Sequence, residues 1–360
     1  MPSRKTLAAS IADDRIDTTM KKIFLRIIKY IFLIGLIIFL FIILYPRTYN
    51  VPEFQQRTGT QYWDLPTGSR IGYSLIKSKG TKKTYPVIYL QGGPGAPIFD
   101  SNIEILSKLT DYGYDLYLYD LVGCGHSNRL DNIDEYSVDR HKKDLEEIIK
   151  KIGAEKVIFI AQSWSAMLAT NYIADNELKI EKIIFTGAGP ILPINYELEK
   201  INAPDSLNLK TPMFTNAQGR QKAYNLRAGV VKFIAEKFGY KLASENEMDN
   251  FATNLNFEMN KSTVVDASKI KPKSGYGYYV NIKTAQSFDN TANRREALSK
   301  CEIPILIMSG QFDGRKWGYT DEYLKLFKNH QLVIIPKAGH SIAVEQPELY
   351  ITTIIKFLNE

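Results

Sequence analysis

The chain has few residues of the kinds that build cross-links or metal centres, with two cysteines and four histidines among 360 residues. Two cysteines are too few for a disulfide framework. Cys124 follows one predicted strand and Cys301 precedes another, so we expect two free thiols at opposite ends of a sheet. The sequence shows neither metal-ligand spacing nor a phosphate-binding glycine loop before a helix. No metal and no cofactor are therefore predicted.

A concentrated basic surface is also missing, although the formal net charge is +7. Lysines and arginines are spread along the chain among acidic residues, and no nucleic-acid-binding motif accompanies them. Nucleic acid is therefore not expected as a partner. The composition, with 44% hydrophobic and 24% charged residues, is typical of a folded protein. The length predicts one large domain with an insertion, or two domains.

One long apolar run lies near the N-terminus, IFLRIIKYIFLIGLIIFLFIILY at residues 23–45. A helix of this length extends about 34 Å at about 1.5 Å per residue, which is enough to cross a bilayer. Arg26 and Lys29 interrupt only its first turns, and their long stems can reach the lipid headgroups. Because the run is apolar on every face, it is unlike a helix buried against a soluble core.

The charges around this run predict its orientation. Arg47 and Arg57 are the basic residues that soon follow it, whereas more basic residues precede or open it, namely Arg15, Lys21, Lys22, Arg26 and Lys29. The positive-inside rule then places the N-terminus in the cytoplasm and the large domain on the extracytoplasmic side. A cleaved signal peptide is the alternative, but the run is long and no small-x-small site follows it. We expect a tail at 1–22 and an uncleaved single-pass membrane anchor at 23–45.

Beyond this segment, short β-rich runs alternate with helical patterns, which predicts a mostly parallel sheet covered by helices. Most of the runs are almost continuously apolar, as in strands that are buried on both faces. The expected strands are residues 61–64, 70–77, 87–90, 116–119, 157–160, 183–185, 305–308 and 332–335. The expected helices between them are residues 137–152, 164–174, 320–327 and 347–358.

The alternation stops between the sixth and seventh expected strands. The sequence there is polar, rich in Asn and Lys, and indicates several helices without a buried strand. So long a segment cannot be a plain loop in a compact domain. We predict an inserted helical cap at 191–299, which divides the core into 46–190 and 300–360.

A candidate nucleophile follows the fifth expected strand. The strand VIFIA leads through QSWS directly into a helical pattern, which places Ser163 at a sharp turn between strand and helix. Such a turn needs small residues two positions before and after the nucleophile, and Ala161 and Ser165 meet this requirement. The alternative is that Ser163 only caps the helix that follows.

The order of the remaining candidates supports a catalytic triad. Asp313 follows a strand in SGQFDGR and His340 follows the next strand in KAGHS, so both lie at carboxyl ends of parallel strands. Ser, Asp, His is also the chain order of hydrolases with a strand-turn-helix nucleophile. His126 and His141 precede Asp313, and His330 lies at the amino end of its strand, so His340 alone fits.

These residue types suit nucleophilic catalysis. The Ser163 hydroxyl becomes a nucleophile when His340 accepts its proton, and the Asp313 carboxylate holds the histidine in the required tautomer. The other acids after that strand, Asp321 and Glu322, are expected on the solvated face of a helix.

A glycine-rich turn, QGGPG at residues 91–95, follows the third expected strand. Glycines let the backbone approach a substrate oxygen and direct N–H groups at it. We assign the oxyanion hole to the N–H groups of Gly93 and Trp164, with Gly92 as the fallback. The alternative is a merely flexible turn.

Together these motifs resemble the proline iminopeptidase family of α/β-hydrolases, a group of serine aminopeptidases with a helical cap. The resemblance covers about 61–190 and 303–358. Its carriers are QGGPG for the family's HGGPG, YDLVGCGHS for DQRGxGxS, AQSWSA for GxSWGG, then GQFD and AGHS. The resemblance implies an α/β-hydrolase fold with a mostly parallel eight-stranded sheet, helices on both faces and an inserted helical cap, here preceded by a transmembrane helix.

The sequence departs from the family at positions that bear on the substrate. Gln91 replaces a histidine, Leu121 and Val122 replace Gln-Arg, and Ser165 with Ala166 replaces paired glycines. Family members hold the free amine of the substrate with carboxylates, for which this chain offers Glu197, Glu199, Glu236, Glu258 and Glu296. None matches a family motif, so no substrate-binding residue is assigned.

Three functions remain open. The leading hypothesis is a serine hydrolase that cleaves an ester or amide in a small molecule or short peptide through an acyl-enzyme, as a proline-iminopeptidase-like aminopeptidase. The second is a carboxylesterase or acyl-lipid hydrolase. A membrane anchor would hold such an enzyme close to its lipid substrate. The third is a catalytically silent envelope interaction module, although a scaffold has no need of a triad.

Overall fold

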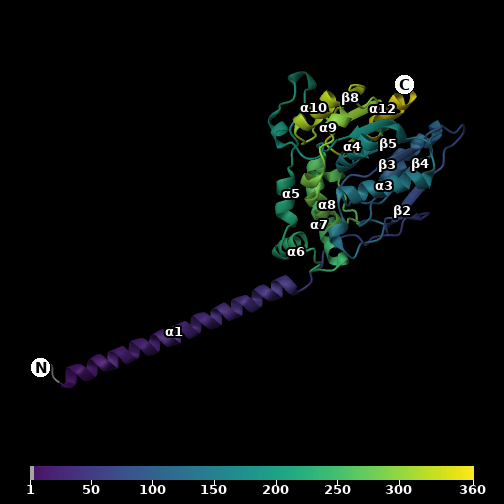
Figure 1. Cartoon of the computed structure of the whole chain (residues 1–360). Helices are drawn as coiled ribbons and strands as arrows, with labels where there is room; N and C mark the ends of the chain where they lie inside the picture. The colour runs from purple at the N-terminus through teal and green to yellow at the C-terminus, as the bar shows by residue number, and fades with distance from the viewer. Residues whose placement is uncertain (1–3) are drawn as a thin grey trace. The chain divides into compact units, whose positions relative to one another are not determined.

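The computed structural model describes the backbone of residues 4–360 and the side chains of residues 20–360 apart from residue 42. It contains two separate units, Met1–Arg47 and Thr48–Glu360. The first unit is one helix, α1 (Arg4–Leu44), drawn in purple in Figure 1. Its segment Met20–Phe41 has a mean hydropathy of 2.5 and is not buried in the protein. Within the described residues, this helix alone is long and apolar enough to cross a membrane.

The second unit is built on an eight-stranded sheet with the strand order β1-β2-β4-β3-β5-β6-β7-β8. The pairs β1–β2 and β2–β4 are antiparallel and the other neighbours are parallel, so the predicted mostly parallel sheet is confirmed. The strands are β1 (Gln61–Asp64), β2 (Arg70–Ile76), β3 (Val87–Leu90), β4 (Leu116–Tyr119), β5 (Val157–Gln162), β6 (Ile180–Thr186), β7 (Ile305–Gly310) and β8 (His330–Ile335).

Two apolar cores lie on opposite faces of this sheet, because successive side chains of a strand point to opposite sides. In β5, Phe159 and Ala161 belong to one core, while Ile158 and Ile160 belong to the other. The first core contains side chains of α3 (Val138–Ile152), α4 (Trp164–Asn176) and α10 (Trp317–Leu326). The second contains side chains of α2 (Asp100–Leu106), α11 (Ile342–Glu345) and α12 (Pro347–Asn359). Helices therefore cover both faces, as predicted.

Between β6 and β7 the described chain contains helices and no strand. They are α5 (Asn216–Ala223), α6 (Leu226–Phe238), α7 (Glu245–Asn260), α8 (Tyr278–Gln286) and α9 (Arg295–Leu298). Of these, α5 packs on α7, and α8 packs on both α6 and α7, as the green helices beside the sheet in Figure 1 show. The helical character matches the expectation, while the boundaries 191–299 of a separate cap remain a prediction.

Buried polar contacts hold these helices against the core. Arg129, in the loop after β4, forms an ion pair of 2.7 Å with Asp249 of α7, which also accepts the Tyr278 N–H at 2.9 Å. Burial raises the pKa of the Asp249 carboxyl to about 6, although Arg129 opposes this shift. On α3, His141 Nε2 lies 2.9 Å from Thr284 Oγ1 of α8, and burial lowers the pKa of His141 to about 3. His141 is therefore a neutral contact residue.

Candidate active site

The backbone at Ser163 adopts a conformation that is rare for a residue with a side chain. Its φ is 57° and its ψ is −117°, between the end of β5 and the first residue of α4. Strain of this kind persists only where the surrounding structure enforces it. Ser163 occupies the N-cap position, but its side chain makes no capping hydrogen bond. The alternative role as a plain helix cap therefore leaves its hydroxyl unexplained.

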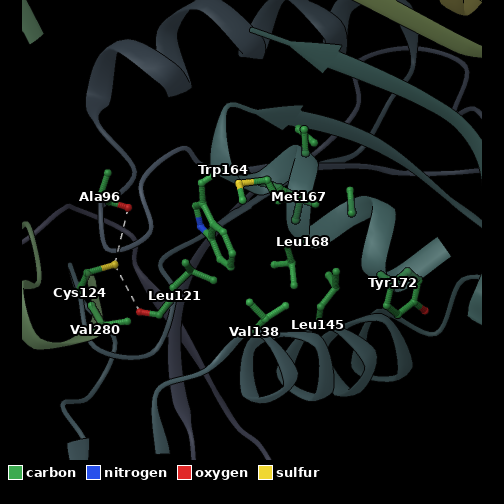
Figure 2. Close-up of a cluster of buried hydrophobic side chains, with 14 of the residues drawn as sticks. Ala96, Leu121, Cys124, Val138, Leu145, Trp164, Met167, Leu168, Tyr172 and Val280 are labelled. Carbon is green, nitrogen blue, oxygen red and sulfur yellow. Dashed lines mark hydrogen bonds between the residues drawn. The ribbon is translucent and has the colours of Figure 1, made fainter. Parts of the chain in front are cut away.

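The residue after Ser163 anchors this turn in the core. The Trp164 side chain is buried and points into the cluster that contains Leu121 and Val138, as Figure 2 shows. Its ring also stacks on Phe288, with centroids 5.8 Å apart. In the same cluster, the Cys124 thiol lies 3.4 Å from the carbonyl oxygen of Leu121 (Figure 2). This packing leaves the turn little freedom to relax.

Asp313 and His340 are brought together by the ends of β7 and β8. His340 Nδ1 lies 2.9 Å from Asp313 Oδ2, and their side chains are 14% and 5% exposed. Burial alone would raise the pKa of the Asp313 carboxyl, but His340 and Arg315 beside it hold that pKa below its ordinary value. Asp313 is therefore an ionised acceptor for the imidazole, and the catalytic role of this pair remains a prediction.

Gly187, just past the end of β6, makes room for this pair. A Cβ atom at Gly187 would lie 2.7 Å from the His340 ring and 3.2 Å from Asp313 Oδ2, and the φ of Gly187 is +53°. Only glycine fits both requirements without displacing the ring. No sequence pattern singles out Gly187, because a glycine after a strand is common in any turn.

Arg315 is the main addition that the structure makes to the predicted site. Its Nη2 donates a hydrogen bond of 2.6 Å to Ser163 Oγ, and its Nε and Nη2 lie 3.4 Å from the two ring nitrogens of His340. Among the hydrogen bonds described for residues 4–360, none joins Ser163 directly to His340. The guanidinium therefore lies between the candidate nucleophile and the candidate base. Its position in GQFDGR, two residues after Asp313, is the one sequence signal that points to it.

The predicted oxyanion hole lies beside Ser163. Gly92 and Gly93 line the same cleft as the serine, and a Cβ atom at Gly92 would lie 3.5 Å from Ser163 Cβ. No hydrogen bond described for residues 4–360 uses the N–H of Gly93 or that of Trp164. The assignment of the oxyanion hole to these two N–H groups remains a prediction, and Trp164 is not among the residues described as lining the cleft. Ser165 holds the glycine-rich turn in place, because its hydroxyl donates a hydrogen bond to the carbonyl oxygen of Gln91.

Ser163, Arg315 and His340 open into a cleft of about 310 Å³ between the core and the helical segment. Apart from His340, the side chains with basic or acidic groups that line this cleft are all lysine or arginine: Lys269, Lys271, Lys273 and Arg315. No carboxylate of the described residues lines it. The five glutamates considered for binding an amine do not reach it. They contact other groups instead: Glu197 with Lys200, Glu199 with Tyr319, Glu236 with Lys232, Glu258 with Lys261, and Glu296 with Lys300.

The two alternative acids lie on α10, away from His340. Asp321 forms an ion pair of 2.5 Å with Lys325 on its own helix. Glu322 forms one of 2.6 Å with Arg295 and is buried. The expectation of a solvated face is therefore wrong for Glu322, because Arg295 compensates its charge inside the protein. Across the described residues, no group of three or more His, Cys, Asp or Glu side chains is placed to hold a metal ion.

The alpha/beta hydrolase fold family matches residues 85–347, which is most of the chain. The chain belongs to the α/β-hydrolase family. This α/β-hydrolase is 23% identical over 295 residues to a proline iminopeptidase of Heyndrickxia coagulans, which covers 81% of this chain and 96% of the relative. It is also 23% identical over 297 residues to a proline iminopeptidase of Saccharolobus solfataricus, with 81% and 90% covered.

Solved structures agree with this family. An esterase from Exiguobacterium antarcticum has a TM-score of 0.54 and 17% identity, covering 83% of this chain and 99% of the esterase. A bromoperoxidase from Bacillus anthracis has a TM-score of 0.55 and 17% identity, with 84% and 100% covered. At such identities the structures show the shared fold alone. They confirm the predicted fold, while the family match and the sequence relatives show a hydrolase enzyme.

Proposed function

We propose that this α/β-hydrolase is a serine hydrolase that cleaves an ester or amide bond through an acyl-enzyme on Ser163. The observation that carries the proposal is the strained Ser163, whose hydroxyl caps no helix, in one cleft with the hydrogen-bonded pair of Asp313 and His340. Helix capping alone does not account for that strain, and a solvent-exposed histidine would not be held by a buried carboxylate.

The reaction follows from these positions. Ser163 Oγ attacks the substrate carbonyl carbon while His340 Nε2 accepts its proton, and the charge on the carbonyl oxygen is stabilised by the N–H groups of Gly93 and Trp164. The bond to the alcohol or amine then breaks, and His340 returns the proton to that leaving group. Water attacks the acyl-enzyme with His340 again as base, which releases the acid and restores Ser163. Contact between Oγ and Nε2 forms when the guanidinium of Arg315 withdraws.

Two finer forms of this activity have separate support. The relatives called proline iminopeptidase favour an aminopeptidase, which must bind a cationic N-terminal amine. The cleft favours the carboxylesterase alternative, because its charged side chains are basic and would repel such an amine. Like charges placed close together across a binding site repel each other and lower the affinity.

A fluorophosphonate probe tests the proposal. The probe is expected to form a covalent adduct with the purified protein, and peptide mapping by mass spectrometry is expected to place the adduct on Ser163. The reason is that the probe reacts with a serine that a neighbouring base activates. Heat-unfolded protein is the control and should not react. An adduct on another serine, or none on the folded protein, contradicts the proposed mechanism.

We further propose that residues 23–45 anchor the chain in a membrane with the N-terminus in the cytoplasm. Support comes from the exposed apolar segment Met20–Phe41 and from the basic residues that open it. The candidate site lies in the unit Thr48–Glu360, whereas this helix belongs to the unit Met1–Arg47.

Deleting residues 1–45 should therefore yield a soluble protein that retains esterase activity, because the sheet and both cores lie after residue 47. The measurement compares probe labelling and kcat/KM in the supernatant after ultracentrifugation. Full-length protein, the control, should sediment with membranes. A truncated protein that is well expressed but aggregated would mean that α1 belongs to the fold.

A further inference from the structure

The guanidinium of Arg315 carries a positive charge that no carboxylate neutralises directly. Its side chain is half-buried, and no ion pair described for residues 20–360 includes it. The nearby carboxylate of Asp313 is engaged elsewhere, since Oδ2 binds His340 and Oδ1 accepts the backbone N–H of Arg315 at 3.1 Å. The side-chain donors of Arg315 point instead at Ser163 Oγ and the His340 ring.

This arrangement is costly unless an anion enters the cleft. Burial lowers the pKa of Arg315 from its ordinary value, although Asp313 opposes the shift. A cation removed from water without a paired anion destabilises the protein. A ligand carboxylate would relieve this cost, because a guanidinium matches a carboxylate through two parallel hydrogen bonds.

A second cation lines the same cleft and also lacks a carboxylate partner among the described ion pairs. Lys273 is half-buried, donates a hydrogen bond of 2.7 Å to Ser101 Oγ, and lies 4.6 Å from the centre of the Phe99 ring. Burial lowers the pKa of the Lys273 amine as well, with Asp100 opposing the shift. The two cations belong to distant parts of the chain, so their meeting in one cleft is a property of the tertiary structure.

We infer that the substrate of this enzyme is an ester that carries a carboxylate, and that Arg315 binds this carboxylate while Lys273 adds to the favourable charge of the cleft. The inference rests on the proposed serine hydrolase function. Arg315 Nη2 is 2.6 Å from Ser163 Oγ. A carboxylate that meets the guanidinium in this position lies within about 8 Å of the scissile carbonyl carbon, given usual contact distances.

The same contact couples substrate binding to activation of the nucleophile. In the free enzyme Arg315 donates to Ser163 Oγ and separates it from His340. An ionised carboxylate is a stronger acceptor than a neutral hydroxyl, so it draws the guanidinium toward itself. Ser163 Oγ is then free to donate its proton to His340. A neutral or cationic ester does not compete for Arg315 in this way.

The test compares three ethyl esters of similar length: monoethyl glutarate, diethyl glutarate and ethyl 4-(trimethylammonio)butanoate. Acid release is followed at constant pH with the full-length enzyme. We expect the highest kcat/KM for monoethyl glutarate. In Arg315→Gln the ratio of kcat/KM for the monoester to that for the diester should fall about 10- to 100-fold, as expected when a charged hydrogen bond is lost. Arg315→Lys should lower the ratio less, because it keeps the charge.

Lys316→Gln is the matched control, because it removes an exposed positive charge from the next residue and should leave the ratio unchanged. Thermal melting and probe labelling show that each variant is folded. Preference for the diester or the cationic ester in the wild type overturns the inference. An equal change in kcat/KM for all three esters in Arg315→Gln also overturns the inference. It would mean that Arg315 only blocks contact between Ser163 and His340. In either case, continued probe labelling of Ser163 in the wild type means that the proposed serine hydrolase function still stands. Absence of that labelling would instead contradict the serine hydrolase function itself.

Discussion

Replacing Ser163 with alanine is expected to lower kcat for a cleaved ester about 1000-fold or more, because the members of a triad act as a unit. The change removes the atom that forms the acyl-enzyme and leaves only transition-state binding at the oxyanion hole. Its effect on folding should be small, since the Ser163 hydroxyl caps no helix and its one described hydrogen bond is to Arg315. The measurements are steady-state kinetics, fluorophosphonate labelling and the melting temperature.

Ser165→Ala is the matched control within the same turn. The Ser165 hydroxyl is buried and donates to the carbonyl of Gln91, so its loss should lower the free energy of unfolding by about 1 kcal/mol. Labelling at Ser163 should remain. If Ser163→Ala keeps near-normal turnover, a different residue is the nucleophile.

Replacing Asp313 with asparagine is expected to be nearly as damaging to activity. In proteases with this triad, the same change lowers kcat about 10⁴-fold, because the amide holds the histidine in the wrong tautomer. Asp313 Oδ2 lies 2.9 Å from His340 Nδ1, and the carboxylate also compensates the imidazolium that forms during attack. The expected result is a loss of kcat of about 1000-fold or more with little change in KM. Melting temperature should change little, because asparagine keeps an acceptor for the Arg315 N–H.

The two acids on α10 provide the comparison. Asp321→Asn removes a partly exposed ion pair with Lys325 and should change both activity and stability little. Glu322→Gln leaves Arg295 without its buried carboxylate partner, so it should lower the melting temperature while turnover persists. Loss of turnover in either of these variants, with near-normal turnover in Asp313→Asn, would reassign the acid and leave Ser163 and His340 in place.

The fold was predictable from the sequence because its signals are local. Strands buried on both faces are almost continuously apolar, so VIYL, LYLY and VIFI stand out as such strands. The limits of individual strands were less certain, and β6 begins at Ile180, three residues before the predicted 183. The strand β8 begins at His330, two residues before the predicted 332, because polar residues at a strand end contribute backbone pairing without an apolar signal.

The candidate triad was also accessible from sequence, and for a geometric reason. Parallel strands bring their carboxyl ends to one edge, so residues just after β5, β7 and β8 must lie near one another. Ser163, Asp313 and His340 follow those strands, and the structure places Asp313 and His340 in hydrogen-bonding contact. Chain order and strand ends select His340 from the four histidines as the candidate base, and this assignment remains a prediction.

Tertiary structure alone decided the charge of the cleft and the partner of each polar side chain. Lys273 comes from the segment whose polar helices show no family motif, and the packing of that segment brings it to the same cleft as Arg315. Likewise, no pattern in the sequence shows that Glu322 faces Arg295 or that Gly187 underlies the His340 ring. Apolar periodicity reports which face of an element is buried, because burial follows a simple repeat. Contacts between side chains depend on the paths of several loops at once, and those paths are set only when the whole core has packed.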